Sequence, residues 1–266
     1  MTAEQPISHR SLFLPIVGGL TVLAWAALFL WEQSPYGRYL DHGDWTAIGI
    51  AASICRVIPA GPVVVPLLLY AAGWLLMLSA MMLPTTLPLL EMFRRLTADR
   101  RHRTKLVALL IAGYLMVWSA FGIAVHLVDR LLHEVVARLD WLTFNGWAVG
   151  AAVLVLAGAF QFSALKYRCL DKCRSPRSFI VAHWRGGAEA WHAFRLGIDH
   201  GAFCVGCCWA IMLLMFVVGT GNVGWMLVLG VLMALEKNVP WARRLSKLLG
   251  VALLAWAGAI LLAHVI

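Results

Sequence analysis

Charged residues are scarce in this chain. Only 13% of its 266 residues are Asp, Glu, Lys or Arg, while 62% are hydrophobic. No Walker or dinucleotide-binding glycine pattern follows a predicted strand, and Gly-x-Ser-x-Gly and His-Glu-x-x-His motifs are absent. The usual signatures of nucleotide-binding proteins, serine hydrolases and zinc peptidases are therefore missing. The soluble stretches are too short to build a core of their own, so the sequence predicts a single domain over residues 1–266.

Long apolar runs predict an all-α, polytopic bundle of membrane helices. A hydrocarbon core about 30 Å thick needs roughly 20 apolar residues per helix. Residues 201–235 are too long for one span, and residues 219–222 near their middle have the composition of a turn, which indicates a helical hairpin. Pro84 and Pro88 predict that a helix kinks or ends near Leu83. The seven expected spans lie near residues 11–31, 62–90, 106–128, 141–165, 201–218, 222–236 and 248–266.

The basic residues behind the net charge of +9 are concentrated in alternate loops. Lys and Arg number six in residues 91–105, seven in residues 166–200 and four in residues 236–247, and Arg10 adds one in the N-terminal tail. The other connections hold four. The positive-inside rule then places the basic loops and the N-terminus in the cytoplasm and the C-terminus outside. We interpret the basic charge as a determinant of membrane topology that also contacts lipid headgroups, and we expect no nucleic-acid partner.

Five of the six cysteines lie within forty residues, on the side expected to be cytoplasmic. Cys169 and Cys173 precede a basic loop, and Cys204, Cys207 and Cys208 follow it. Cytoplasmic thiols stay reduced unless they are catalytic or bind metal. A set of structural disulfides is therefore not expected here.

The second cysteine group has the spacing of one helical face. Because residues three and four apart share a face, His200 and the three cysteines form a stripe that Met212 and Met215 continue. Soft sulfur ligands favour Cu(I), and several thiolates together also suit Zn²⁺. A single buried cysteine or methionine is more often packing, but the grouping favours a soft-metal site. The candidate ligands are His200, Cys204, Cys207 and Cys208, with Cys169 and Cys173 closing the site, Met81, Met82, Met212 and Met215 as weak ligands, and Glu236 orienting His200 or accepting protons.

A weaker polar constellation lies on the expected outer side. An Asp-His-Gly-Asp loop and three histidines at span ends could form a harder metal-entry site with nitrogen and oxygen ligands. A solvated turn and unrelated histidines are the simpler interpretation. The residues concerned are Asp41, His42 and Asp44 in the loop, and His126, His133 and His264.

Three functions fit these patterns. The first is handling of a soft metal, most simply Cu(I), with zinc as the alternative. The second is a membrane thiol oxidoreductase, since Cys204-Val-Gly-Cys207 has the C-x-x-C spacing, although no βαβ pattern surrounds it. The third is a membrane assembly subunit whose cysteines only pack. Because no catalytic constellation is visible, a non-enzymatic role is favoured and no catalytic residue is assigned.

Six short pieces of the chain carry a resemblance to a known family. They are Ala80-Met-Met-Leu-Pro84, Gln161-Phe-x₃-Lys166 with Cys169, Cys173-Arg-Ser-Pro176, Gly197-x-x-His200-Gly, Cys204-x-Gly-Cys207-Cys208-Trp209 and Glu236-Lys237. The family they resemble consists of bacterial predicted metal-binding integral membrane proteins, sometimes described as copper-chaperone-like. The likeness runs from about Tyr36 to the C-terminus and implies a metal-binding membrane protein. We therefore expect a multi-pass protein of the bacterial inner membrane, with the lipid bilayer and a metal-donor or metal-acceptor protein as partners.

Overall fold

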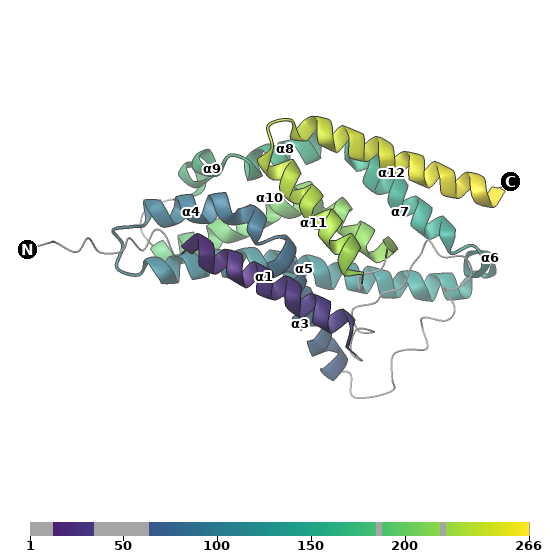
Figure 1. Ribbon diagram of the computed structural model, residues 1–266, viewed down its shortest axis with the longest axis horizontal. Coiled ribbons are helices and arrows are strands. Elements are labelled where there is room, and N and C mark those ends of the chain that lie inside the picture. The colour runs from purple at the N-terminus through teal and green to yellow at the C-terminus, as the bar shows by residue number, and fades with distance from the viewer. Residues whose placement is uncertain (1–12, 35–63, 185–187, 219–221, 266) are drawn as a thin grey trace, which may run out of the picture.

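Helices form all of the regular structure in the described part of the chain, which comprises residues 13–34, 64–184, 188–218 and 222–265 of the computed structural model (Figure 1). No strand occurs within these ranges, which confirms the all-α prediction. The elements are α1 (Phe13–Glu32), α3 (Val64–Met81), the 3₁₀ helix η2 (Pro84–Thr86), α4 (Leu87–Leu96), α5 (Arg103–Arg138), α6 (Asp140–Phe144), α7 (Trp147–Phe160), α8 (Ala164–Cys173), α9 (Pro176–His183), α10 (Glu189–Val218), α11 (Val223–Asn238) and α12 (Ala242–Val265).

Three of these helices are long and apolar enough to cross a membrane, namely α5, α10 and α12. Two bent pairs raise the number to five if each pair forms one span. The first pair joins Ala71–Met81 to Pro84–Leu96 with a bend of 44°, and the second joins Trp147–Phe160 to Ala164–Cys173 with a bend of 66°. The seven spans and their orientation stay predictions.

The interruption expected near Leu83 is present. Helix α3 ends at Met81, and η2 begins at Pro84. Proline has no N–H to donate and its ring clashes with the preceding turn, so the α-helical ladder stops here. The hydroxyl and the backbone N–H of Thr85 both donate hydrogen bonds to the carbonyl oxygen of Met82, at 2.7 and 3.2 Å, so this carbonyl is satisfied at the break.

A second break divides the apolar run expected to span residues 141–165. Helix α7 ends at Phe160, and α8 begins at Ala164 in a new direction. The Ser163 hydroxyl caps α8 by accepting a 3.1 Å hydrogen bond from the backbone N–H of Lys166. This turn carries the cysteines of α8 against α10.

The expected hairpin near residues 219–222 is confirmed by its two arms. Helix α10 ends at Val218, and α11 starts at Val223. The Asn222 side chain accepts a 3.0 Å hydrogen bond from the backbone N–H of Trp225, so it is the N-cap of α11.

Helices α5 and α10 pack with their backbones in contact. A Cβ atom on Gly113 would collide with the carbonyl oxygen of Phe194, and one on Gly197 would collide with that of Leu110. Glycine at these positions allows the close approach. One turn after Gly197, a Cβ atom on Gly201 would lie 3.0 Å from Val117 Cβ, whereas Gly197 itself meets Leu110. Residue numbers therefore increase together from Leu110 to Val117 and from Gly197 to Gly201, so α5 and α10 run parallel.

Buried apolar side chains form two clusters of different composition. The larger cluster, here called the sulfur-rich core, has 30 buried residues, of which seven are methionine and four are cysteine. The smaller cluster, here called the sulfur-free core, has ten buried residues without sulfur among those that the structure describes. The sulfur-bearing residues are Met77, Met81, Met82, Cys169, Cys204, Cys207, Cys208, Met212, Met215, Met226 and Met233.

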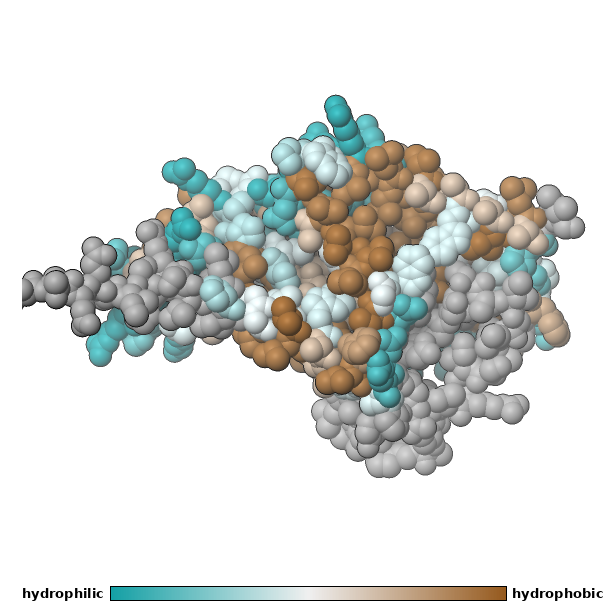
Figure 2. All heavy atoms as spheres, viewed as in Figure 1, coloured by the Kyte–Doolittle hydropathy of each residue, from teal (hydrophilic) through white to brown (hydrophobic). Residues whose placement is uncertain are grey.

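Large apolar side chains also cover much of the outside. Val22, Ile123 and Leu262 are 68%, 59% and 62% exposed. Figure 2 shows hydrophobic residues across the middle of one face, with hydrophilic residues gathered toward the end where α4 and α9 lie. An exposed apolar surface of this extent suits contact with lipid.

Candidate metal centre

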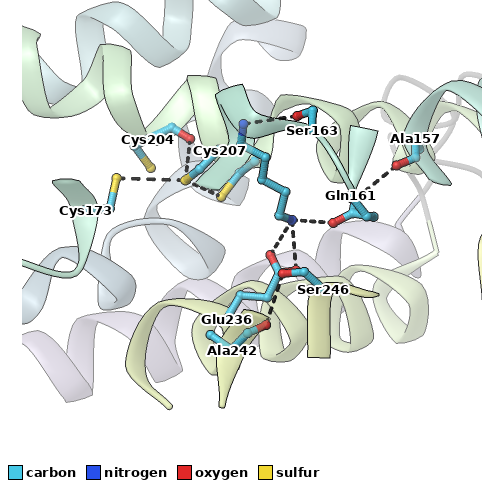
Figure 3. A network of polar contacts seen from close by, with 11 residues as sticks. Ala157, Gln161, Ser163, Cys173, Cys204, Cys207, Glu236, Ala242 and Ser246 are labelled. Carbon is cyan, nitrogen blue, oxygen red and sulfur yellow. Dashed lines mark hydrogen bonds and ion pairs between the residues drawn. The ribbon is translucent and has the colours of Figure 1, made fainter. Parts of the chain in front are cut away.

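Thiols from α8 and α10 meet inside the sulfur-rich core. Cys173 Sγ lies 3.9 Å from Cys207 Sγ, which in turn lies 3.3 Å from Cys208 Sγ (Figure 3). All of these cysteines are free, and Cys173 is the one that is only partly buried. A tetrahedral site with metal–sulfur bonds of about 2.3 Å places neighbouring sulfurs ~3.8 Å apart. The Cys173–Cys207 separation therefore suits two ligands of one metal ion.

Cys204 connects these thiols to a buried lysine. Its Sγ accepts a 2.9 Å hydrogen bond from Lys237 Nζ and lies 3.1 Å from the Tyr114 hydroxyl. Lys237 Nζ also donates to Thr85 Oγ1 at 2.8 Å. The Cys204 side chain therefore connects α10 directly to α5 and α11, and Lys237 extends the connection to η2.

The partners of Lys237 determine how its charge is balanced. The side chain is 6% exposed, and an ammonium that leaves water needs a negative partner nearby. Of its two hydrogen-bond acceptors, the Thr85 hydroxyl stays neutral, whereas the Cys204 thiol can become a thiolate. The thiolate is also the form that binds metal ions, so Lys237 favours the ligand form of Cys204.

His200 lies one turn before Cys204 on α10 and is 3% exposed. Its ring packs 5.8 Å from that of Tyr114 and 5.4 Å from that of Phe179, measured between centroids. Its Nδ1 atom is buried and has no hydrogen-bond partner among the described residues. Because buried ring nitrogens are normally satisfied, this atom is a candidate ligand next to the thiols.

Cys169 occupies the contact between α8 and α10. A Cβ atom on Gly206 would lie 2.6 Å from Cys169 Sγ, so the missing side chain at position 206 allows the two helices to approach. This contact holds α8 in the place where Cys173, one turn further along, meets Cys207.

The four methionines predicted as weak ligands all lie in the sulfur-rich core. Met81, Met82, Met212 and Met215 are each buried. The backbone carbonyl of Met82 also faces the Tyr114 hydroxyl at 3.5 Å. The structure therefore places these thioethers in the same packed core as the thiols.

Glu236 lies in a neighbouring network. Each of its carboxylate oxygens accepts a 2.8 Å hydrogen bond from Lys166 Nζ, and one also accepts a 2.7 Å bond from Ser246 Oγ (Figure 3). Lys166 Nζ donates in addition to Gln161 Oε1. Glu236 therefore balances Lys166 and ties α8 to α11 and α12, while the charged residue beside the thiols is Lys237.

Sequence reasoning assigned no role to Lys166 or Lys237. The available signal was the position of both lysines at the ends of apolar runs, where a buried ionisable side chain is rare and often functional. Their partners are distant in sequence, so the pairing itself could not be read from the pattern.

A comparison with known families decides the identity. A family model described as PpoB2, copper chaperone, matches residues 71–260 of the chain. This chain belongs to the PpoB2 copper chaperone family. The match includes every cysteine of the thiol site and both buried lysines. No curated protein and no solved structure matches the chain.

The thiols of this copper chaperone family member do not yet form a coordination shell. Within the described ranges, no group of three or more His, Cys, Asp or Glu side chains is arranged so that it could hold a metal ion. The thiols are instead engaged with protein groups. Cys204 contacts Lys237 and Tyr114, and Cys207 Sγ donates to the Cys204 carbonyl oxygen at 3.2 Å. Metal binding here requires side-chain rotations that exchange these contacts for metal–sulfur bonds.

The outer constellation is not assembled in the part of the chain that can be described. Residues 41–44 lie outside the described residues. His133 Nδ1 lies 2.8 Å from the carbonyl oxygen of Asp129, and His264 Nδ1 lies 2.8 Å from that of Ile260. Neither histidine belongs to a metal-binding group of described side chains.

Proposed function

We propose that this copper chaperone family member takes up Cu(I) at the α8–α10 thiol site and passes it to another protein. Copper is the cargo, and zinc is the competing metal. The primary ligands are Cys204, Cys207 and Cys208, with His200 Nδ1 as a further donor. Cys169 and Cys173 are exchangeable copper ligands at the entrance of the site. Further inside, copper is bound weakly by Met81, Met82, Met212 and Met215.

The contact between Cys173 and Cys207 carries this proposal. The two sulfurs are 3.9 Å apart, one is partly exposed on α8 and the other is buried on α10. A Cu(I) ion can be received by the accessible thiol and shared with the buried one before the first bond breaks. Soft thiolate ligands select Cu(I), and exchange between them combines tight binding with rapid transfer.

We also propose that the thiol site opens toward the cytoplasm of a bacterial inner membrane. The long apolar helices support membrane insertion. The basic loops flank the cysteines, so the positive-inside rule supports seven spans with the N-terminus inside. The donor or acceptor protein would then reach Cys173 from the cytoplasm.

The direct test is the metal content of the detergent-purified, reduced protein after expression with added copper and zinc. We expect near-stoichiometric copper in the wild type and its loss in a variant with Cys204, Cys207 and Cys208 all changed to Ser. Met116→Leu is the matched control, because Met116 is 48% exposed on α5 and lies away from the thiols.

Two outcomes would contradict the proposal. Zinc that is lost in the triple variant would identify a zinc site. If neither protein holds copper against a Cu(I) chelator, and Cys173 and Cys207 instead form a reversible disulfide with a defined potential, the thiol oxidoreductase hypothesis would replace it.

A further inference from the structure

We infer that the buried methionines form a path along which Cu(I) leaves the thiol site and crosses the helix bundle. This inference rests on the proposed function and adds transport across the membrane to binding and delivery. The path, here called the thioether column, consists of Met77, Met81, Met82, Met212, Met215, Met226 and Met233.

Three helices are aligned at the thiol end of the column. Lys237 Nζ contacts both Cys204 Sγ and Thr85 Oγ1, so these positions of α11, α10 and η2 lie at one level. Moving away from this level into the bundle, residue numbers rise along α10 and fall along α11 and α3. The side chain of Met81 lies 3.5 Å from the place of a Cβ on Gly230, which shows that α3 and α11 stay in contact further along.

Contacts with α5 confirm this direction for α3. Tyr114 on α5 faces the Met82 carbonyl, and Trp74 Nε1 donates a 3.1 Å hydrogen bond to the carbonyl oxygen of Trp118. As residue numbers fall along α3 they rise along α5, so the two helices are antiparallel. Since α5 is parallel to α10, all four helices extend away from the thiol level together.

Methionines recur at matching depths along these helices. An α-helix rises about 1.5 Å per residue, so sequence separation from the aligned level gives the depth of each side chain. The first sulfurs lie one turn from the aligned level, and the deepest lie three turns from it. On α10 and α11 the depths are about 6 Å for Met233, about 12 Å for Met212 and about 16 Å for Met215 and Met226. The Met81 side chain packs against Gly230, which lies about 10 Å deep on α11, so Met81 is close to the depth of Met212 and Met77 is one turn deeper. Met82 is one residue nearer to the thiol level than Met81.

Composition distinguishes this column from ordinary packing. All seven methionines are at most 4% exposed. The sulfur-free core of the same protein fills its interior with Leu, Ile, Val, Phe and Ala, so packing alone does not require methionine. The other methionines that the structure describes lie outside the column: Met92 is partly buried at the edge of the sulfur-free core, and Met116 is 48% exposed.

Thioethers suit the transfer step chemically. A neutral thioether is a soft ligand that holds Cu(I) without the tight binding of a thiolate, so the ion can exchange between neighbours. In each step a bond to the next sulfur forms as the bond to the previous one breaks. Copper stays Cu(I), and neither an electron nor a proton is transferred between the thioethers.

The test is Cu(I) uptake into lipid vesicles that contain the full-length protein and a trapped, membrane-impermeant Cu(I) chelator dye. Three combined variants remove one depth each: Met82→Leu with Met233→Leu, Met81→Leu with Met212→Leu, and Met77→Leu with Met215→Leu and Met226→Leu. Leucine keeps the side-chain volume and removes the sulfur. We expect each combined variant to lower the uptake rate by at least about tenfold, because a gap of one level interrupts the ligand series.

Copper stoichiometry of the same preparations separates this inference from the proposed function. The methionine variants should retain the copper bound by the thiols, which also shows that they are folded. A variant with Met92→Leu and Met116→Leu is the matched control and should transport at the wild-type rate. Single variants, Met81→Leu and Met212→Leu, replace any combined variant that does not fold.

Two results would overturn the thioether column. The first is that the wild-type protein binds copper but its vesicles take up Cu(I) no faster than protein-free vesicles. This result would support the thiol site and exclude transport. Combined methionine variants that transport at the wild-type rate would show that the methionines only pack. Loss of copper binding by the wild-type protein would instead contradict the proposed function.

Discussion

Lys166 and Lys237 are both almost completely buried, yet their ammonium groups meet different partners. Lys166 donates hydrogen bonds to both carboxylate oxygens of Glu236, which supplies its counter-charge. Lys237 ends on the thiol of Cys204 and a neutral hydroxyl. The same cation therefore joins helices in one network and stands next to a potential metal ligand in the other.

The two lysine networks therefore suit different tasks: one fixes the helices, and the other lies where metal ligands exchange. The Lys166 network binds the start of α8 to α11 and α12. Its amine, carboxylate and hydroxyl groups are poor ligands for a soft metal. The Lys237 network involves a thiol that copper would compete for. One lysine can hold α8 in place while ligands rearrange around the other, which directly follows Glu236 on α11.

The largest expected effect comes from removing the counter-charge of Lys166. Glu236→Gln keeps the size of the side chain but leaves a buried ammonium without a negative partner. We expect the free energy of unfolding to fall by about 3–5 kcal/mol, measured by thermal or denaturant unfolding in detergent.

A compensated variant is the control for this change. Lys166→Met with Glu236→Leu removes both charges, and replacing a buried pair by apolar groups is often close to neutral. Stability in this double variant should recover toward the wild-type value. A Glu236→Gln protein as stable as the wild type would show that the ion pair does not join these helices.

Removing the thiol partner of Lys237 should lower copper affinity more than stability, whereas Glu236→Gln mainly lowers stability. In Cys204→Ser, the hydroxyl preserves a hydrogen bond to Lys237 but is a poor ligand for Cu(I). We expect Cu(I) affinity, measured by competition with a Cu(I) chelator, to fall by at least about a hundredfold, more than for loss of a group outside the ligand shell. Unchanged affinity would exclude Cys204 from the metal site.

Lys237→Met should weaken copper binding without removing any ligand. The buried thiolate of Cys204 loses its positive partner, so its ligand form becomes less favourable. Groups that support ligands typically change metal affinity by about tenfold or more, and we expect a decrease of that size in the same chelator competition. The Lys166→Met with Glu236→Leu protein should bind as the wild type does, and equal losses in both proteins would erase the distinction between the two lysines.

The smallest expected effect is geometric. Gly206→Ala inserts a methyl group against Cys169 Sγ and pushes α8 away from α10. We expect a stability loss of about 1 kcal/mol. Transfer of copper to a chelator, followed by stopped-flow absorbance, should also slow, because Cys173 then stands further from Cys207. Gly258→Ala is the control, since nothing lies within 4 Å of its Cβ position, and similar slowing there would contradict the explanation.

Much of the helical architecture could be predicted from local pattern. Apolar run lengths located the long helices, the prolines predicted the break near Leu83, and the turn composition of residues 219–222 predicted the hairpin. The break before α8 was not predicted, because residues 161–163 contain no proline or glycine. It depends on the Ser163 cap and on the tertiary anchoring of Lys166.

The candidate site was predictable only in part. Helical spacing placed His200 and the three cysteines of α10 on neighbouring turns, and the structure brings Cys173 to them. The roles of the charged residues could not be derived, because Lys166 meets Glu236 across 70 residues and Lys237 meets Cys204 across 33. Local periodicity contains no information about pairs at that separation.

The most direct test of the thiol site is the copper X-ray absorption spectrum of the reduced, copper-loaded protein. The account predicts a Cu(I) edge with a first coordination shell dominated by sulfur, and loss of that shell when Cys204, Cys207 and Cys208 are changed to Ser. A shell of nitrogen and oxygen, or a sulfur shell that persists in the triple variant, would contradict it.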